Sequence, residues 1–273
     1  MRLVEVLGPD EELRQGDVVK NMAGEGWPYG ARHAFVLTAD CDLAQKKHYG
    51  QVLLCPIITA ELYSRLVWCQ RKAEAIDKKI IDQVVRTFTE LAARGVISEV
   101  SPSVLDIITN DVSVMAAALD GISGIAAGTR QELIRLAEAR MHILRTDIDQ
   151  LSKCRLALQA KDRKEVSIIH GSLVSDFKKD IAADAQDVVV IPNDIDRDGL
   201  VHVMLLRCPF SLLASSVCLT VRSGDEYLRL GRYVPEIKYL VAQKFGTLFS
   251  RVGMKRTIED DTKISVALLE ILE

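Results

Sequence analysis

Gly16-Asp-Val-Val-Lys20 opens the stretch that decides the fold, and Gly30-Ala-Arg-His-Ala-Phe-Val-Leu-Thr38 and Gln51-Val-Leu-Leu-Cys-Pro-Ile-Ile-Thr59 follow it. Each run is short, rich in Val, Ile and Leu, and bounded by Gly, Pro, Asp or Asn. This pattern is typical of the strands of a small barrel or sheet. Arg32 opens one of the predicted strands, and Thr59 closes another.

A second β-rich zone extends from residue 187 to about residue 233. Its runs are again short and bounded by turn residues: Asp187-Val-Val-Val-Ile191, Leu200-Val-His-Val-Met-Leu-Leu206 and Tyr227-Leu-Arg-Leu-Gly231. Each zone alone offers few strands for an independent core. We therefore expect the two zones to share one domain, although two separate β-rich domains joined by helices are the competing topology.

Helical periodicity fills the middle of the chain. Apolar residues recur every three or four positions from Ser64 to Arg94, which indicates a long amphipathic helix. Ser101 and Pro102 predict the start of a second helix that continues to Leu119. Thr129 and Glu132 form a capping-box pattern for a third helix that reaches Leu151. The segment is thus expected to form a helical hairpin or bundle.

The predicted fold class is α+β, with a small β-barrel built from both ends of the chain and a large helical insertion. Insertion into a surface loop costs little closure entropy. We expect residues 1–61 to be the first part of the barrel domain, 62–185 the insertion, and 186–273 the second part with C-terminal helices. Pro235 is predicted to open a helix that Gly253 ends, and Lys263 to Glu273 to form a terminal helix.

Composition restricts the class of protein. The 273 residues are 48% hydrophobic and 27% charged, as in an ordinary folded protein. No apolar run reaches the roughly 20 residues that cross a bilayer, so we expect a cytoplasmic protein without a membrane partner. The net charge of −3 argues against nucleic-acid binding by long-range attraction but leaves a local groove open.

The cysteines give little support to a metal or a disulfide framework. All six lie apart, without a Cys-x-x-Cys pair. Cys41, His48 and Cys55 could converge on a metal, but the spacings between them match no common zinc finger. We therefore expect no metal and no cofactor.

The N-terminal block resembles the MazF/PemK family of toxin ribonucleases. Gly16-Asp-Val-Val19 is similar to that family's opening strand, Gly30 to Leu37 to its Gly-x-Arg-Pro-x-Val-Val-Leu segment, and Ile58-Thr59-Ala60 to the threonine-bearing end of a later strand. The resemblance implies an SH3-like barrel that cuts single-stranded RNA without a metal. It also implies an antitoxin-like protein inhibitor as a partner, with Arg32 and Thr59 at the catalytic positions. His33 stands where the family usually has proline.

The chemistry of these residues fits that implication. Cleavage through the RNA's own 2′-hydroxyl needs groups that align the phosphate and stabilise its extra negative charge. The guanidinium of Arg32 has the fixed charge and planar fork for that role, and Thr59 adds a hydrogen bond. Residues 24–29 would form a loop over the RNA, with Trp27 and Tyr29 as substrate contacts. His33 and His48 are candidates for binding substrate or moving protons.

Other interpretations stay open at each of these positions. Arg32 would otherwise be a surface or ion-paired residue, and Thr59 an ordinary strand end. A barrel of this kind also serves as a binding module without activity, since fold does not fix function. The alternative function is therefore a non-catalytic interaction or regulatory module that uses the barrel and the helices to bind a protein partner or a second copy.

For three further motifs, a structural role explains the sequence better than a functional one. Asp40-Cys-Asp42 is expected to begin a helix with a carboxylate as its cap. Asp194-Ile-Asp-Arg-Asp-Gly199 resembles half a calcium loop, but Leu205 stands where the bidentate acid belongs, so a hairpin turn is favoured. The basic residues between Tyr233 and Arg256 are expected to be a solvated helix face, with a nucleic-acid surface as the alternative. His142 and His170 are expected to be structural.

Overall fold

The computed structural model describes residues 3–8, 11–183, 187–191, 195, 200–218 and 227–250. The chain divides into two compact units, which are described separately. The sheet unit takes the described residues of Met1–Thr59 and Asp184–Glu273, and the helical unit is Ala60–Ala183. The boundaries expected from sequence fall after residues 61 and 185.

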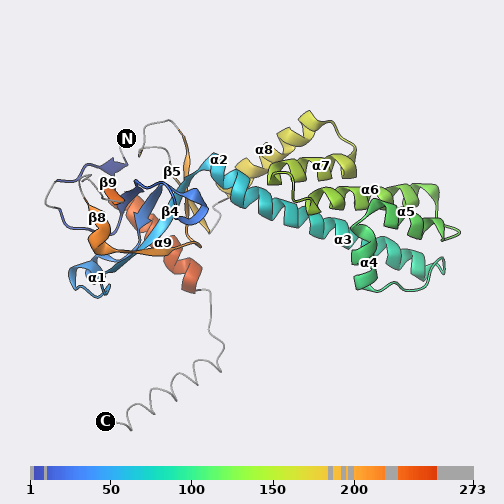
Figure 1. Ribbon diagram of the computed structural model, residues 1–273, viewed down its shortest axis with the longest axis horizontal. Coiled ribbons are helices and arrows are strands. Elements are labelled where there is room, and N and C mark those ends of the chain that lie inside the picture. The colour runs from blue at the N-terminus through green and yellow to red at the C-terminus, as the bar shows by residue number, and fades with distance from the viewer. Residues whose placement is uncertain are drawn as a thin grey trace, which may run out of the picture. The chain divides into compact units, whose positions relative to one another are not determined.

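The sheet unit contains a curled, almost wholly antiparallel sheet that forms a half-barrel (Figure 1). Its order is β1-β9-β2-β3-β4-β6-β5, while β7 pairs with β4 and β8 pairs in parallel with β9. The strands are β1 (Val4–Glu5), β2 (Asp17–Asn21), β3 (His33–Val36), β4 (Gln51–Thr59), β5 (Val188–Ile191), β6 (His202–Leu205), β7 (Phe210–Leu213), β8 (Val217–Cys218) and β9 (Tyr227–Tyr233). A mixed α+β fold is therefore confirmed.

The core of this unit lies between the sheet and α9 (Pro235–Ser250), which begins at the predicted proline. Phe35 pairs across the strands with Val18 and Cys55, so the three side chains share one face. Val241 from α9 is fully buried in the same cluster. Burial of each such large apolar side chain contributes about 1.5–3 kcal/mol, which makes α9 a cover for the sheet.

The helical unit is a bundle of two long helices with shorter ones around them (Figure 1). Its elements are α2 (Ala60–Tyr63), a π-helical turn (Ser64–Trp68), α3 (Cys69–Ala93), α4 (Pro102–Thr109), α5 (Val112–Asp120), α6 (Ala127–Leu144), α7 (Gln150–Asp162) and α8 (Val166–Ala182). Ile80, Val84 and Phe88 are buried along α3 at the spacing expected from the sequence.

Two helix boundaries expected from sequence are wrong. The helix that starts at Ser101 does not reach Leu119, because the carboxylate of Asp111 accepts from the backbone of Ser113 and Val114 and starts α5 at a bend of 119°. The third helix begins after Ala126, without a side-chain cap, so Thr129 is inside α6 and forms no capping box.

That third helix also ends earlier than Leu151. α6 stops at Leu144, and the Asp149 carboxylate accepts from Ser152 N and starts α7. Asp194 to Gly199, Gly253, Lys255, Arg256 and Lys263 to Glu273 lie outside the described residues, apart from Ile195. The predictions that fall on them stay predictions.

A buried arginine joins three helices of the helical unit. Arg140 on α6 is 5% exposed, and its Nε lies 3.1 Å from Asp77 Oδ1 on α3. Its Nη2 lies 2.5 Å from Asp106 Oδ1 on α4, and Nη1 donates to Thr109 Oγ1. One guanidinium thus satisfies polar groups that would otherwise be left inside the bundle, which fixes α4 against α6.

We predict that Arg140→Ala lowers the free energy of unfolding by about 3 kcal/mol, because it leaves two carboxylates without their cation. This value is at the low end for a buried pair, since the Asp106 side chain is 58% exposed. Urea denaturation followed by circular dichroism measures it. Arg130→Ala is the control, since Arg130 pairs with a 77% exposed Asp120, and its effect should stay below about 1 kcal/mol. Equal losses in the two variants would contradict the structural role of Arg140.

Candidate functional site

Arg32 and Thr59 occupy neighbouring strand ends in the sheet unit. Arg32 directly precedes β3 and is exposed, whereas Thr59 is the half-buried last residue of β4. His33 is paired with Ile57 across these strands. Because successive side chains of a strand point to opposite faces, Thr59 shares the face of Ile57 and therefore of His33. Arg32 lies in a bend outside β3, so the strand register assigns its side chain to neither face. That Arg32 and Thr59 meet at one phosphate stays a prediction.

The structure brings Thr59 and His33 together with a third polar residue, His202. Thr59 pairs with His202 on β6, and the two imidazole rings lie edge to face with centroids 6.5 Å apart. His33 and His202 are only 4% and 3% exposed. Nδ1 of His202 has no hydrogen-bond partner within the described part of the chain. These groups have the chemistry for proton transfer, but a polymer cannot reach them in this conformation.

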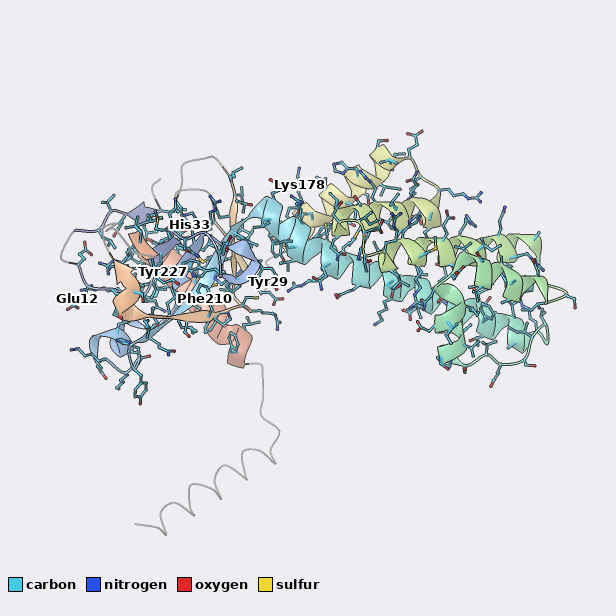
Figure 2. All side chains as sticks on the ribbon, in the orientation of Figure 1. Glu12, Tyr29, His33, Lys178, Phe210 and Tyr227 are labelled. Carbon is cyan, nitrogen blue, oxygen red and sulfur yellow. The ribbon has the colours of Figure 1, made fainter. Side chains whose placement is uncertain are left out.

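Of the two aromatic residues predicted to contact RNA, one is buried and the other is exposed. Trp27 is 7% exposed, stacks on Tyr227 with centroids 5.7 Å apart, and contacts Phe210 at 5.0 Å. Tyr29 is 41% exposed in a turn of positive φ, and its hydroxyl accepts from Cys208 Sγ. Figure 2 labels Tyr29, Phe210 and Tyr227 on the sheet unit. Trp27 is therefore part of the packing, and Tyr29 is the accessible aromatic of this loop.

His48 and Thr59 lie near opposite ends of β4. His48 is half-buried in the loop before β4, where its carbonyl accepts from Gln51 N. β4 begins at Gln51 and ends at Thr59, so the two residues are separated by roughly 25 Å of strand. His48 and Thr59 therefore do not form one site.

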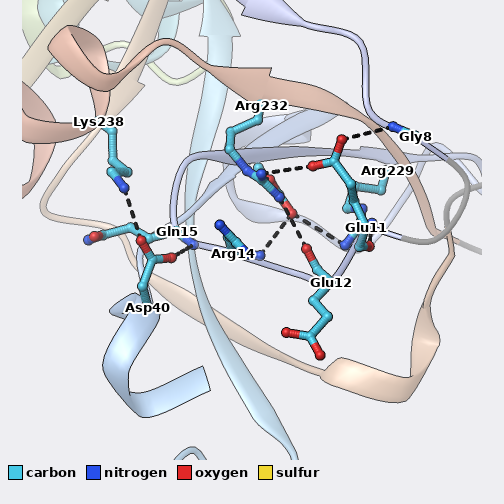
Figure 3. Close-up of polar contacts among 10 residues, drawn as sticks. Gly8, Glu11, Glu12, Arg14, Gln15, Asp40, Arg229, Arg232 and Lys238 are labelled. Atoms are coloured by element: carbon cyan, nitrogen blue, oxygen red, sulfur yellow. Dashed lines mark hydrogen bonds and ion pairs between the residues drawn. The ribbon is translucent and has the colours of Figure 1, made fainter. Parts of the chain in front are cut away.

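Asp40 begins α1 (Asp40–Ala44) as expected but is not its cap. Its carboxylate accepts from Gln15 N at 2.8 Å and pairs with Lys238 Nζ on α9 at 2.9 Å (Figure 3). Burial alone would raise the pKa of Asp40, but the hydrogen bonds from Lys238 and Gln15 outweigh it and lower that pKa. The residue thus links α1 to α9, which is a structural role.

A metal site at Cys41, His48 and Cys55 has no support in the geometry. Cys41 is exposed, whereas Cys55 is fully buried on the core face of β4. Burial raises the pKa of the Cys55 thiol, which keeps it in its neutral form. No group of three histidine, cysteine or acidic side chains among the described residues is arranged to hold a metal ion.

A buried ionic network joins β2 to β9 (Figure 3). Asp17 is fully buried; its Oδ1 lies 2.6 Å from Arg232 Nε, and its Oδ2 lies 3.4 Å from Arg229 Nη1. Arg232 also pairs with Glu11 Oε2 at 3.0 Å. Burial raises the pKa of Asp17, while the hydrogen bonds from Arg232 and Arg14 N oppose that shift. The network thus holds β2 to β9, which is a structural role.

The helical unit exposes large apolar side chains on α4 and α5. Val104 and Ile107 on α4 are 45% and 62% exposed, and Val114 on α5 is 42% exposed. Among the described residues no single helix is long and apolar enough to span a membrane, although the bent pair of α4 and α5 passes that test when taken together. We call Val104, Ile107 and Val114 the α4–α5 apolar face.

A groove lies beside the same helices. It has a volume of about 400 Å³ and is lined mainly by apolar side chains from the end of α3, the following loop and α4. Phe88, Ile97 and Leu105 are among its apolar lining residues. Exposed apolar side chains next to an apolar groove mark protein contact surfaces more often than catalytic ones.

We predict that Asp40→Asn costs under about 1 kcal/mol at pH 7, because the ion pair with Lys238 is partly exposed. Since folding lowers the pKa of Asp40, its ionised form contributes stability above the unfolded pKa, about 4, and this contribution is lost as pH falls through the folded pKa. The difference from wild type should therefore shrink toward pH 3 in urea denaturation. Asp42→Asn is the matched control. A cost for Asp40→Asn that does not decrease between pH 7 and pH 3 would refute the assigned role of the ion pair.

Large apolar side chains are exposed on both units, and among the helices they include the α4–α5 apolar face. His202, Arg229 and Arg232 were not singled out from sequence, because only the pairing of distant strands brings them to Thr59 and Asp17. No family model, curated protein or solved structure matches this chain.

Proposed function

We propose that this protein is a non-catalytic interaction module whose helical unit assembles with a second copy of the chain. The observation that carries the proposal is the α4–α5 apolar face, which includes Ile107 at 62% exposure. Side chains of this size are exposed at an energetic cost that a contacting surface removes. Beside them, Ala117 is exposed and small, which permits close approach of another helix.

Charge favours a second copy as the occupant. A twofold interface brings identical surfaces together, so like charges on them would repel. The acidic residues of α4, α5 and their caps are engaged within the unit, because Asp106 pairs with Arg140, Asp120 pairs with Arg130, and Asp111 caps α5. The α4–α5 apolar face can therefore meet its own copy without bringing unpaired carboxylates of that face together.

The sheet unit is the scaffold in this proposal. We take its curled half-barrel to be SH3-like, a type of fold that often serves binding without catalysis. A cytoplasmic location and a separate protein partner for the barrel remain predictions. The endoribonuclease hypothesis has less support from the geometry, because His33 and His202, which lie beside Thr59, are buried.

The first experiment measures self-association of the intact chain by sedimentation velocity. An interface built on a few apolar side chains is small, so we expect a dimer with a Kd on the order of micromolar. Ile107→Asp should raise that Kd by at least about tenfold, since it places a charge in the contact. Ile168→Asp on α8 is the control, because Ile168 is equally apolar and 57% exposed.

Three results would contradict this proposal. One is a wild-type protein that stays monomeric up to concentrations well above micromolar. Another is equal weakening by Ile107→Asp and Ile168→Asp, which would mean that the α4–α5 apolar face is not the contact. Binding of the protein to lipid vesicles without self-association would also exclude a second copy as the occupant.

The second experiment tests the competing nuclease. We predict that the purified protein, with a chelator present, cleaves unstructured RNA no faster than its Arg32→Ala and Thr59→Ala variants. Cleavage by wild type that falls on the order of 10²-fold in Arg32→Ala would instead establish a phosphate-stabilising guanidinium. RNA methylated at the 2′-oxygen is the control substrate, because it lacks the internal nucleophile.

A further inference from the structure

A cationic pocket lies between α6 and the end of α7 in the helical unit. It has a volume of about 400 Å³, which is within the range of small-ligand sites. Arg135 and His142 line it from α6, and Arg163 and Lys164 line it from the residues that follow α7. Leu156 and Ala160 supply an apolar wall.

Backbone geometry explains why the cations from two elements meet there. Arg135 and His142 are seven residues apart on α6, so both lie on the same helix face. Arg163 adopts the left-handed conformation with φ 54° as the C-cap of α7, and its N–H donates to Gln159 O at 2.9 Å. That turn takes Arg163 and Lys164 off the helix, where they line the pocket.

These cations lack anionic partners inside the protein. Within the described residues neither Arg163 nor Lys164 makes an ion pair, and Arg135 donates only to the carbonyl of Gln131. Glu138 is the one carboxylate in the pocket lining. It is exposed, and it makes no ion pair with the residues that the structure describes. The lining thus carries three full positive charges against one negative charge, on a chain whose net charge is −3.

The histidine gives a second and independent observation. Nδ1 of His142 is buried and has no hydrogen-bond partner within the described part of the chain. A buried polar atom without a partner costs about 1–3 kcal/mol, and His142 is also one of the residues that line the pocket. Other cations of this unit are used differently, since Lys72 pairs with Asp176 and Arg145 with Asp147.

We propose that this pocket binds a phosphorylated small molecule. Two guanidinium groups present planar forks that match phosphate oxygens, and the Lys164 ammonium adds a third positive charge. The apolar wall of Leu156 and Ala160 accommodates a carbon-bearing part of the ligand, which inorganic phosphate lacks. The proposal is independent of self-association through α4 and α5.

Isothermal titration calorimetry of the full chain at low salt tests it with two probes, inorganic pyrophosphate and ADP. Both should bind, ADP more tightly because of the apolar wall, and binding should weaken as salt rises. Arg163→Gln and Arg135→Gln should each weaken ADP binding by at least about tenfold. Arg86→Gln is the matched control, since Arg86 is an exposed arginine on α3 outside the pocket lining.

Several outcomes would overturn the proposal. Absence of binding by both probes would do so, and equal weakening by Arg86→Gln would show nonspecific attraction to charge. Tighter binding of pyrophosphate than of ADP would indicate a site for the free anion. Binding of a short single-stranded RNA in preference to ADP would assign the surface to nucleic acid. Circular dichroism of each variant establishes that the helices are retained.

Discussion

β9 lies between β1 and β2, and this placement closes the sheet unit with strands from both ends of the described chain. Gly231 of β9 pairs with Val18, beside a bulge of β9 at Leu230. A Cβ at residue 231 would lie 2.5 Å from Glu5 O and 2.6 Å from Val4 Cγ1, so only glycine allows β1 to approach so closely. The Asp17 network then fixes the register, because Asp17 is directly opposite Arg232.

Local patterns in the sequence predicted the elements better than their partners. The Val-rich and Ile-rich runs became β2 to β6 and β9, and the apolar spacing along α3 matched its buried face. These features depend on neighbouring residues only. The break at Asp111 was missed, because the apolar period continues through it and the cap that ends the period is a single side chain.

The partners of the buried polar residues could not be predicted from the sequence. His202 begins an ordinary-looking strand, and nothing near it in sequence indicates that it pairs with Thr59. Arg229 and Arg232 are separated from Asp17 by more than 200 residues, so their ion pairs follow from the topology of the sheet. Arg32 and Thr59 were paired by resemblance, whereas the strand neighbours of Thr59 become visible only once β3, β4 and β6 are paired.

The sheet unit and the helical unit differ in how their polar and apolar side chains are used. In the sheet unit, ion pairs hold Asp17 to β9, and the core face is covered by α9. In the helical unit, Arg140 joins α3, α4 and α6, while apolar side chains on α4 and cations after α7 are exposed or line a pocket. Both binding surfaces that we propose therefore lie in the helical unit.

The central claim is that the chain contains two separately cooperative units, one of which is closed by strands from both ends. Native-state hydrogen exchange of the intact protein carrying Leu133→Ala tests it most directly, since Leu133 is fully buried in α6. The substitution removes core packing worth about 2–5 kcal/mol. The account predicts that amides of α3, α6 and α7 lose protection by that amount, while amides of β2, β3 and β9 keep theirs. An equal loss in the strands would contradict it.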